Sequence, residues 1–343
     1  MGTTISVIGA GSWGTALSVL LGKKGFDVKL WVYEQEVFDT INQARENLRY
    51  LPGVIIPKNI QPVLDKGEAI KGAEIIVLAI PSQLVRMVSA SISQFINEGQ
   101  IIVNVGKGLE VHTLKRLSQV IQEEIPQGKI VILSGPSHAE EVGKDIPTTV
   151  VCASESMEAA ETVQDIFMGP NFRVYTNPDV IGVEAGGALK NIIALAAGIS
   201  DGLGFGDNTK AALMTRGIAE IARLGEAMGA SLLTFAGLTG VGDLIVTCTS
   251  MHSRNRRAGI MIGEGKSLEK TLEAVGMVVE GVKTCEAAYE LSKTLNIEMP
   301  ITEQLYKVLF EGKDARSAVV DLMLRNKTHE SEDVVSAIPM DWL

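Results

Sequence analysis

A glycine-rich segment close to the start of the chain constrains the fold more than any other feature. The segment Gly9–Gly14 reads GAGSWG, and it lies between an apolar run at residues 5–8 and the helix-forming residues 15–17. This order predicts a β-strand, a tight turn and a helix, which form the first unit of a dinucleotide-binding fold. In such a unit the backbone N–H groups at the start of the helix bind the pyrophosphate.

Each glycine of the segment has its own physical role. Gly9 permits the tight turn, Gly11 lets the backbone approach the phosphates, and Gly14 lets the helix pack closely on the strand. Glycine-rich turns also occur in proteins that bind no nucleotide, so the prediction depends on the flanking strand and helix.

The length and charge of the chain narrow the class of protein. At 343 residues the chain exceeds what one hydrophobic core usually supports, so we expect two domains. The formal charge of −10 argues against binding to nucleic acid or anionic membranes, so any anionic ligand needs local positive charge. The N-terminus lacks an export signal, and three widely spaced cysteines fit free thiols in the cytoplasm. Metal-ligand motifs are absent, so we expect no metal site.

Strand-forming and helix-forming stretches alternate through the first half of the chain. The later predicted strands cover residues 28–32, 74–79, 100–104 and 129–133. Such alternation predicts an α/β domain with a Rossmann-type, doubly wound parallel sheet that is covered on both faces. Polar or glycine-rich residues follow several strands, at 81–82, 106–108 and 134–139, and we expect these loops to line one cleft.

The pattern becomes wholly helical after about residue 180. Predicted helices cover residues 179–200, 211–228, 267–275 and 284–294. We therefore expect a dinucleotide-binding domain at 1–180, an all-α C-terminal domain at 181–330 that carries substrate and catalysis, and a tail at 331–343.

Lys190 is the most informative single residue of the helical half. It stands beside Asn191 in a helix that otherwise consists of small and apolar residues. A membrane span is one alternative, but the apolar stretch is short and is interrupted by Glu184, Lys190 and Asn191. A lysine that snorkels from a core helix to solvent is a second alternative. The functional interpretation is a lysine that faces the interdomain cleft, where burial lowers its pKa and allows proton exchange near neutral pH.

A basic cluster at residues 253–257, Ser-Arg-Asn-Arg-Arg, stands out in this acidic chain. The planar fork of donors on an arginine suits a phosphate, and Ser253 and Asn255 can add hydrogen bonds. The alternative is a solvated helix terminus or turn without a ligand.

Eight blocks of this sequence resemble, in the same order, the bacterial NAD(P)-dependent glycerol-3-phosphate dehydrogenase family. The blocks are Gly9–Gly14, Arg49–Gly53, Lys107-Gly108, Ser134–Ala139, Lys190-Asn191, Thr239–Leu244, Arg254-Asn255 and Val279–Gly281. The resemblance covers residue 4 to about residue 325. It implies reversible hydride transfer between NAD(P)H and dihydroxyacetone phosphate, which gives sn-glycerol 3-phosphate for glycerophospholipid synthesis.

The resemblance also implies roles for individual residues. Lys190 is the general acid/base, Asp243 holds its ammonium group or a substrate hydroxyl, and Lys107 reaches the same substrate. Asn191 and Thr247 help to orient these groups. The implied substrate contacts are Lys107, Gly135, Ser137, Lys190, Asp243, Ser253, Arg254 and Asn255. The implied cofactor contacts are Gly9, Gly11, Ser12, Trp13, Gly14, Tyr33, Glu34, Tyr50, Lys107, Ala139, Arg254, Val278 and Glu280.

Glu34 bears on the choice of cofactor. It lies about twenty residues beyond the glycine turn, where an acidic side chain accepts hydrogen bonds from the adenosine ribose and repels a 2′-phosphate. The sequence therefore favours NAD(H) over NADP(H). The alternative is that Glu34 only caps or charges the start of the following helix.

Two other functions compete with this one. The first is a non-catalytic dinucleotide-binding redox regulator, and the second is a related two-domain 3-hydroxyacid or ketopantoate-type dehydrogenase. The joint presence of Lys107, Lys190, Asp243 and Arg254 argues for catalysis on a phosphorylated substrate. We expect a homodimer as the working form, with no nucleic-acid partner and no stable membrane insertion.

Overall fold

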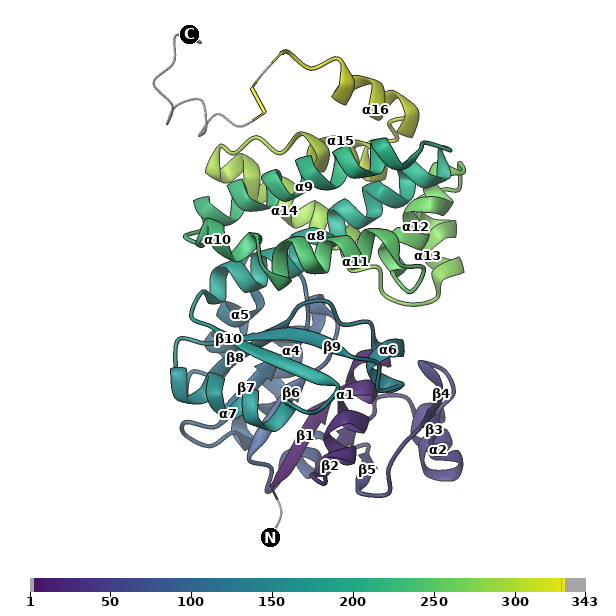
Figure 1. Cartoon of the computed structure of the whole chain (residues 1–343). Helices are drawn as coiled ribbons and strands as arrows, with labels where there is room; N and C mark the ends of the chain where they lie inside the picture. The colour runs from purple at the N-terminus through teal and green to yellow at the C-terminus, as the bar shows by residue number, and fades with distance from the viewer. Residues whose placement is uncertain (1–2, 328, 331–343) are drawn as a thin grey trace.

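One mostly parallel sheet organises the first half of the chain (Figure 1). The computed structural model describes residues 3–327, 329 and 330, so the expected tail at 331–343 lies outside the described residues. The sheet has eight strands in the order β10-β9-β8-β7-β6-β1-β2-β5. Their bounds are β1 Thr4–Ile8, β2 Asp27–Trp31, β5 Ile60–Val63, β6 Ile75–Leu78, β7 Ile101–Asn104, β8 Lys129–Ser134, β9 Thr148–Ala153 and β10 Phe172–Asn177.

The strands expected from the apolar runs are confirmed as β1, β2, β6, β7 and β8, and with them the Rossmann-type sheet. The structure adds β5, β9, β10 and a small hairpin of β3 Glu46–Asn47 and β4 Leu51–Ile55. It also differs from a wholly parallel sheet in one pair, because β9 runs antiparallel to β8. The connection between them holds only the five-residue helix α6 Ala139–Gly143. Such a helix is too short to return along the length of a strand, as a parallel crossover must.

Strand β1 lies at the point where the order of the strands reverses. Strand β1 pairs with β2 on one side and with β6 on the other. In an open α/β sheet this switch point forms a crevice at the carboxyl ends of the strands, where ligands bind. The glycine-rich segment directly follows β1 and therefore lies at that crevice.

Both faces of the sheet are covered, as the apolar character of its strands predicts. Ile5 and Val7 of β1 pack in one core with Leu17 of helix α1, whereas Ile8 packs in a second core with Val85. The helices of the first half are α1 Ser12–Lys23, α2 Gln35–Ala44, α3 Lys66–Ile70, α4 Val85–Ile92, α5 Leu117–Glu124, α6 and α7 Met157–Phe167.

The second half of the described chain is helical and is built around α8 Val180–Gly202 (Figure 1). Asp179 precedes α8, and its carboxylate accepts a hydrogen bond from the Gly182 N–H at 2.8 Å, which satisfies one free donor of the first turn. We place the boundary between the domains at this junction. The other helices are α9 Asp207–Ala227, α10 Leu232–Phe235, α11 Asp243–Thr249, α12 Arg254–Gly263, α13 Leu268–Val275, α14 Glu280–Leu295, α15 Pro300–Phe310 and α16 Ala315–Met323.

Helix α8 is a core helix of this domain. By length and composition, residues 180–202 and 232–249 could each cross a membrane, but 83% of the apolar window of α8 is buried. Its neighbours are α9, α11, α12, α14 and α15. The apolar character of α8 is thus explained by contacts with other helices.

The contact between α8 and α12 is unusually close because both helices carry glycines four residues apart. A Cβ atom at Gly198 of α8 would overlap the Arg256 carbonyl oxygen, and one at Gly259 of α12 would overlap the Leu195 carbonyl oxygen. The same holds one turn further along, at Gly202 and Gly263. Backbone therefore meets backbone, and this contact fixes where α12 begins relative to α8.

We predict that Gly259→Ala destabilises the protein although alanine is the better helix former. The added methyl group forces the two helices apart, and overpacking of this kind costs about 1–3 kcal/mol, more than the ~1 kcal/mol of helix propensity that is gained. Thermal unfolding measures the effect. Gly169→Ala is the matched control, because the nearest atom to its added Cβ is Lys24 Cδ at 4.0 Å. Equal melting temperatures for the two variants would contradict the proposed backbone contact.

Candidate active site

The glycine turn after β1 has the geometry that a bound phosphate requires. Gly9 has a φ of +114°, a conformation that residues with a side chain rarely adopt. A Cβ atom at Gly14 would overlap the Gly9 carbonyl oxygen, so the helix packs directly on the turn. Gly11 precedes α1, and no side chain caps the helix. A Cβ at Gly11 would meet no atom within 4 Å, which leaves open space beside the helix N-terminus.

These features fit the pyrophosphate of a dinucleotide. Helix α1 is 12 residues long, and its first N–H groups and its dipole favour an anion at this end. Ser12 and Trp13, which form the first turn, are both half-buried and border the same space. The residues of the glycine turn and of the first turn of α1 therefore fit the pyrophosphate of the expected dinucleotide.

The side chain of Glu34 is engaged by the β3–β4 hairpin. Glu34 is the residue before α2, yet its carboxylate makes no capping hydrogen bond. Instead, its Oε1 accepts a hydrogen bond from the Tyr50 hydroxyl at 2.6 Å. Burial and this contact with Glu34 both raise the pKa of Tyr50, so the phenol stays protonated and donates. Tyr33, between Glu34 and the end of β2, is exposed.

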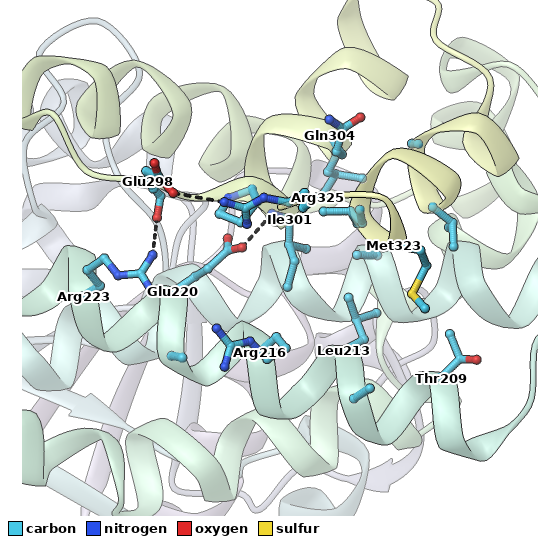
Figure 2. Close-up of a pocket in the computed structure, with 18 of the residues that line it drawn as sticks. Thr209, Leu213, Arg216, Glu220, Arg223, Glu298, Ile301, Gln304, Met323 and Arg325 are labelled. Carbon is cyan, nitrogen blue, oxygen red and sulfur yellow. Dashed lines mark hydrogen bonds and ion pairs between the residues drawn. The ribbon is translucent and has the colours of Figure 1, made fainter. Parts of the chain in front are cut away.

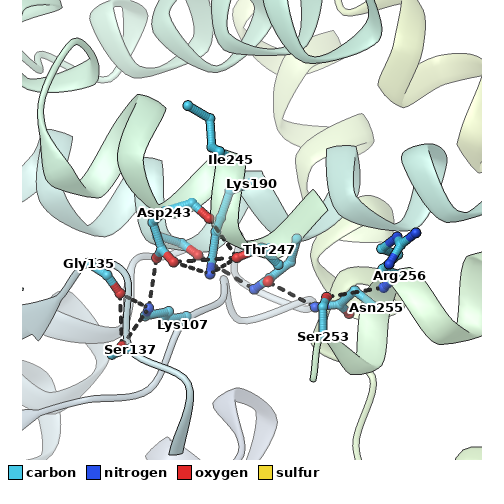
Figure 3. A network of polar contacts seen from close by, with 12 residues as sticks. Lys107, Gly135, Ser137, Lys190, Asp243, Ile245, Thr247, Ser253, Asn255 and Arg256 are labelled. Carbon is cyan, nitrogen blue, oxygen red and sulfur yellow. Dashed lines mark hydrogen bonds and ion pairs between the residues drawn. The ribbon is translucent and has the colours of Figure 1, made fainter. Parts of the chain in front are cut away.

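Two lysines meet one buried carboxylate where the two domains face each other (Figure 3). Lys190 of α8 donates to Asp243 Oδ1 and to the Thr247 hydroxyl, both at 2.6 Å. Lys107, from the loop after β7, donates to the other oxygen of Asp243 at 2.7 Å. Asp243 is 1% exposed and Lys190 is 5% exposed. Lys190 therefore shares its carboxylate partner with a lysine from the sheet domain.

Burial and mutual charge set the protonation of this cluster. Burial lowers the pKa of Lys190 to about 8, with the charge of Lys107 acting in the same direction and Asp243 opposing both. Burial alone would raise the pKa of Asp243, but the two ammonium groups outweigh it and hold that pKa below its usual value. The cluster thus contains a fixed carboxylate and a lysine that can exchange a proton near neutral pH.

The loop after β8 holds the second lysine in place. Lys107 donates to the Gly135 carbonyl oxygen at 2.8 Å and lies 3.4 Å from the Ser137 hydroxyl, which itself donates to the same carbonyl. Gly135 has a φ of +127°. The carboxyl ends of β7 and β8 therefore both contribute to the cluster, as we expected of the loops that follow these strands.

The start of α12 matches the expected phosphate site only in part. The Ser253 hydroxyl caps α12 by accepting from the Arg256 N–H at 3.2 Å. Arg254 is half-buried, and the described residues provide no hydrogen-bonding partner for its guanidinium, although the charges of Glu280 and Glu140 act on it. Arg256 pairs with Asp201 at 2.8 Å instead. Arg254 is thus available to a ligand, and Arg257, whose Nε is buried, likewise has no hydrogen-bonding partner among the described residues.

Asn191 and Asn255 differ from the expected arrangement. The Asn255 amide donates to Asn191 Oδ1 at 2.9 Å, and its oxygen accepts from the Gly281 N–H at 2.9 Å. Both residues are buried, so their side chains join α8, α12 and α14. No hydrogen bond between described residues links Asn191 to Lys190. The structure thus gives the Asn191 side chain a role in positioning helices, and its help in orienting the catalytic groups stays a prediction.

Glu280 connects the helical domain to the sheet. Its carboxylate accepts hydrogen bonds from the N–H and the hydroxyl of Ser82, which lies in the loop after β6. Burial raises the pKa of Glu280, and the contacts with Ser82 oppose that effect. The sequence gives Ser82 no role of its own, although its position after a strand places it among the loops expected to line the cleft.

Two other expected cofactor contacts differ in exposure. Val278, just before α14, is 45% exposed, whereas Ala139, at the start of α6, is buried.

His138 lies in the loop after β8, directly before α6. Its Nε2 is buried and has no hydrogen-bonding partner among the described residues, and its ring centroid lies 5.8 Å from that of His252. Burial and the charge of Lys190 lower the pKa of His138, so the ring is neutral beside the lysine cluster.

A larger hollow lies elsewhere, between α9, α15 and α16 (Figure 2). It has a volume of about 1750 Å³ and shares no residue with the cluster of Lys107, Lys190 and Asp243. Glu220 lies in it and accepts hydrogen bonds from the first N–H groups of α15, at Ile301 and Thr302. The carboxylate of Glu220 therefore caps the start of α15.

Comparison with known proteins gives one consistent result. Models of the NAD-dependent glycerol-3-phosphate dehydrogenase N-terminus and C-terminus match residues 4–160 and 179–320. Glycerol-3-phosphate dehydrogenase (NAD(P)+) of Desulfitobacterium hafniense is 62% identical over 330 residues, which cover 96% of this chain and 94% of that protein. The enzyme of Moorella thermoacetica is 59% identical over 332 residues, 97% and 99% of the two chains. The crystal structure of the enzyme from Coxiella burnetii aligns with a TM-score of 0.92 at 38% identity, over 94% of this chain and 99% of that one.

We predict that Asp243→Asn destabilises the protein by about 3 kcal/mol or more, since removal of one partner from a buried ion pair leaves uncompensated charge. Urea unfolding at pH 7 measures the loss. The control is Glu303→Gln, which removes an exposed carboxylate from an ion pair with Lys307 and should change the free energy of unfolding by less than about 0.5 kcal/mol. Similar small losses in both variants would show that the two lysines are not held by Asp243.

Proposed function

The chain belongs to the NAD-dependent glycerol-3-phosphate dehydrogenase family, and on that basis we propose how it interconverts dihydroxyacetone phosphate and sn-glycerol 3-phosphate. The observation that carries the proposal is the buried array of Lys107, Asp243 and Lys190 at the carboxyl edge of the sheet. When bound, NAD(P)H supplies the hydride.

Lys190 acts on the oxygen of the reacting carbonyl. Its ammonium group has three protons, and Asp243 and Thr247 accept two of them. The third proton is left to bind the carbonyl oxygen, where negative charge develops as the carbon is reduced. An ammonium group at that place stabilises the charge and then delivers the proton.

Asp243 and Lys107 set the position and the pKa of Lys190. Asp243 fixes the position of both ammonium groups, and its charge limits how far burial lowers the pKa of Lys190. Lys107 keeps that pKa low and adds a second donor beside the substrate, together with Ser137. Gly135 contributes a carbonyl oxygen that orients Lys107.

The substrate phosphate binds at the start of α12. The Arg254 guanidinium, the Ser253 hydroxyl and the first N–H groups of the helix offer donors and positive potential. Asn255 acts indirectly, because its amide is used to hold α8 and α14 in place.

Several further assignments belong to this proposal. The dinucleotide lies along Gly9, Gly11 and Gly14, and the half-buried Glu34 gives a preference for NAD(H). The remaining cofactor contacts are Ser12, Trp13, Tyr33, Tyr50, Ala139, Val278 and Glu280. We also propose that the enzyme is a cytoplasmic homodimer that serves glycerophospholipid synthesis. The regulator and the related dehydrogenases have no observation in their favour.

We predict that the purified protein oxidises NADH when dihydroxyacetone phosphate is added, and that Lys190→Ala lowers kcat/KM by about a hundredfold or more. Absorbance of the reduced cofactor measures the rate, with NADPH assayed in parallel. The variant should still bind NADH. Lys210→Ala is the control, because it removes a lysine that pairs with Asp201 outside the cluster. Rates for Lys190→Ala within a few-fold of the wild type would overturn the assignment, and no turnover by the wild type would overturn the function.

The two reaction directions should depend on pH in opposite ways. Reduction needs Lys190 protonated, so its kcat/KM should fall as the pH rises through about 8, the lowered pKa of this lysine. Oxidation of glycerol 3-phosphate needs the neutral amine, so its kcat/KM should rise over the same range. The substrate phosphate, with a second pKa near 6, is mainly dianionic from pH 6.5 and fully so above about pH 8, so it does not titrate near the pKa of Lys190. Profiles from pH 6.5 to 10 that move in the same direction would exclude Lys190 as the shared acid and base.

A further inference from the structure

The β3–β4 hairpin is fastened to the glycine turn by one buried side chain. Asn47 is 0% exposed. Its amide nitrogen donates to the Ala10 carbonyl oxygen and to the Thr15 hydroxyl, both at 2.8 Å. Its amide oxygen accepts from the Tyr50 N–H at 3.1 Å. The residues that follow Asn47 are therefore held at a fixed place beside the end of β2.

Tyr50 uses this position to orient Glu34. Its hydroxyl engages Oε1 of the carboxylate, and Oε2 has no hydrogen-bonding partner among the described residues. Glu34 is half-buried, so the second oxygen remains open to a ligand. An ionised carboxylate held in this way suits a ribose hydroxyl and opposes a phosphate.

Arg49 contacts the ring of the same tyrosine. Its guanidinium carbon is 5.2 Å from the centroid of the Tyr50 ring, a cation–π distance. Among the described residues it pairs only with Glu36, at the long distance of 4.0 Å, and the two side chains are 52% and 80% exposed. An exposed pair of this kind contributes little free energy, so a stronger anion can take its place. A hollow of about 440 Å³ lies beside the guanidinium and is lined by Glu36, Val37, Thr40, Leu48 and Arg49.

We propose that Arg49 binds the 2′-phosphate of NADP(H), while Glu34, held by Tyr50, binds the 2′-hydroxyl of NAD(H). The inference rests on the proposed cofactor site. One ribose subsite then carries two alternative partners that both contact Tyr50, a carboxylate at its hydroxyl for one cofactor and a guanidinium at its ring for the other. Glu34 repels the 2′-phosphate of NADP(H) and Arg49 attracts it. The two cofactors therefore bind with different affinities, and neither is excluded.

The test compares binding of NADH and NADPH without substrate, measured by the fluorescence of the reduced cofactor. Arg49→Gln should raise the Kd for NADPH by roughly tenfold, the effect of one lost charge-assisted contact, and leave the Kd for NADH within twofold. Glu34→Gln should do the reverse, with weaker NADH binding and tighter NADPH binding. Tyr50→Phe should weaken NADH binding several-fold and leave NADPH binding unweakened, because the carboxylate loses its fixed position.

Lys58→Gln is the matched control. It removes the same charge from an exposed residue, next to Asn59, whose side chain binds Gly22 and Phe26 at the opposite end of α1. This variant should change neither Kd. A selective NADPH loss in Lys58→Gln as well, or equal changes for both cofactors in Arg49→Gln, would overturn the inference. Turnover with dihydroxyacetone phosphate tests the enzyme function separately. If the wild type is active and Arg49→Gln leaves the Kd for NADPH unchanged, the role of Arg49 is wrong but the enzyme function stands.

Discussion

The carboxylate of Asp243 lies buried between two ammonium groups, one from each domain, and the geometry of the site depends on this contact. Lys107 comes from the sheet, whereas Lys190 and Asp243 come from the helical domain, so the ion pairs close the interface where the chemistry occurs. Buried ion pairs contribute little net stability, because desolvation of the charges offsets their attraction. Their value here is positional, since Asp243 holds a lysine with a lowered pKa in one orientation.

The helical domain achieves this orientation through backbone contacts. Helices α8 and α12 meet through glycines, which brings the start of α12 close to the turn of α8 that carries Lys190. The pairing of Asn191 with Asn255 then fixes the rotation of the two helices. Polar side chains beside a buried lysine can thus serve the scaffold, since Asn191 and Asn255 join helices whereas Lys190 contacts Asp243.

The sequence predicts those parts of the molecule that are determined locally. The glycine turn and the strands at its side are predictable because a buried parallel strand requires a continuous apolar run. Lys190 is predictable because a lysine within an apolar helix demands a partner. The β9 direction is not predictable from local pattern, since it depends on how far a short connection can reach. The role of Asn255 escapes prediction for a similar reason, because its partners on α8 and α14 are distant in sequence.

The balance of charge at the site explains how a chain with a net charge of −10 binds a phosphate ester. Lys107, Lys190 and Arg254 carry three positive charges, and Asp243 neutralises one of them. Glu280 and Glu140 also act on Arg254, and Ser82 holds the Glu280 carboxylate with two hydrogen bonds beside the loop after β6. The positive groups that can contact an anion therefore lie together in the cleft between the domains. Field lines concentrate in a cleft with low-dielectric walls, so an anion is attracted there although the rest of the surface repels it.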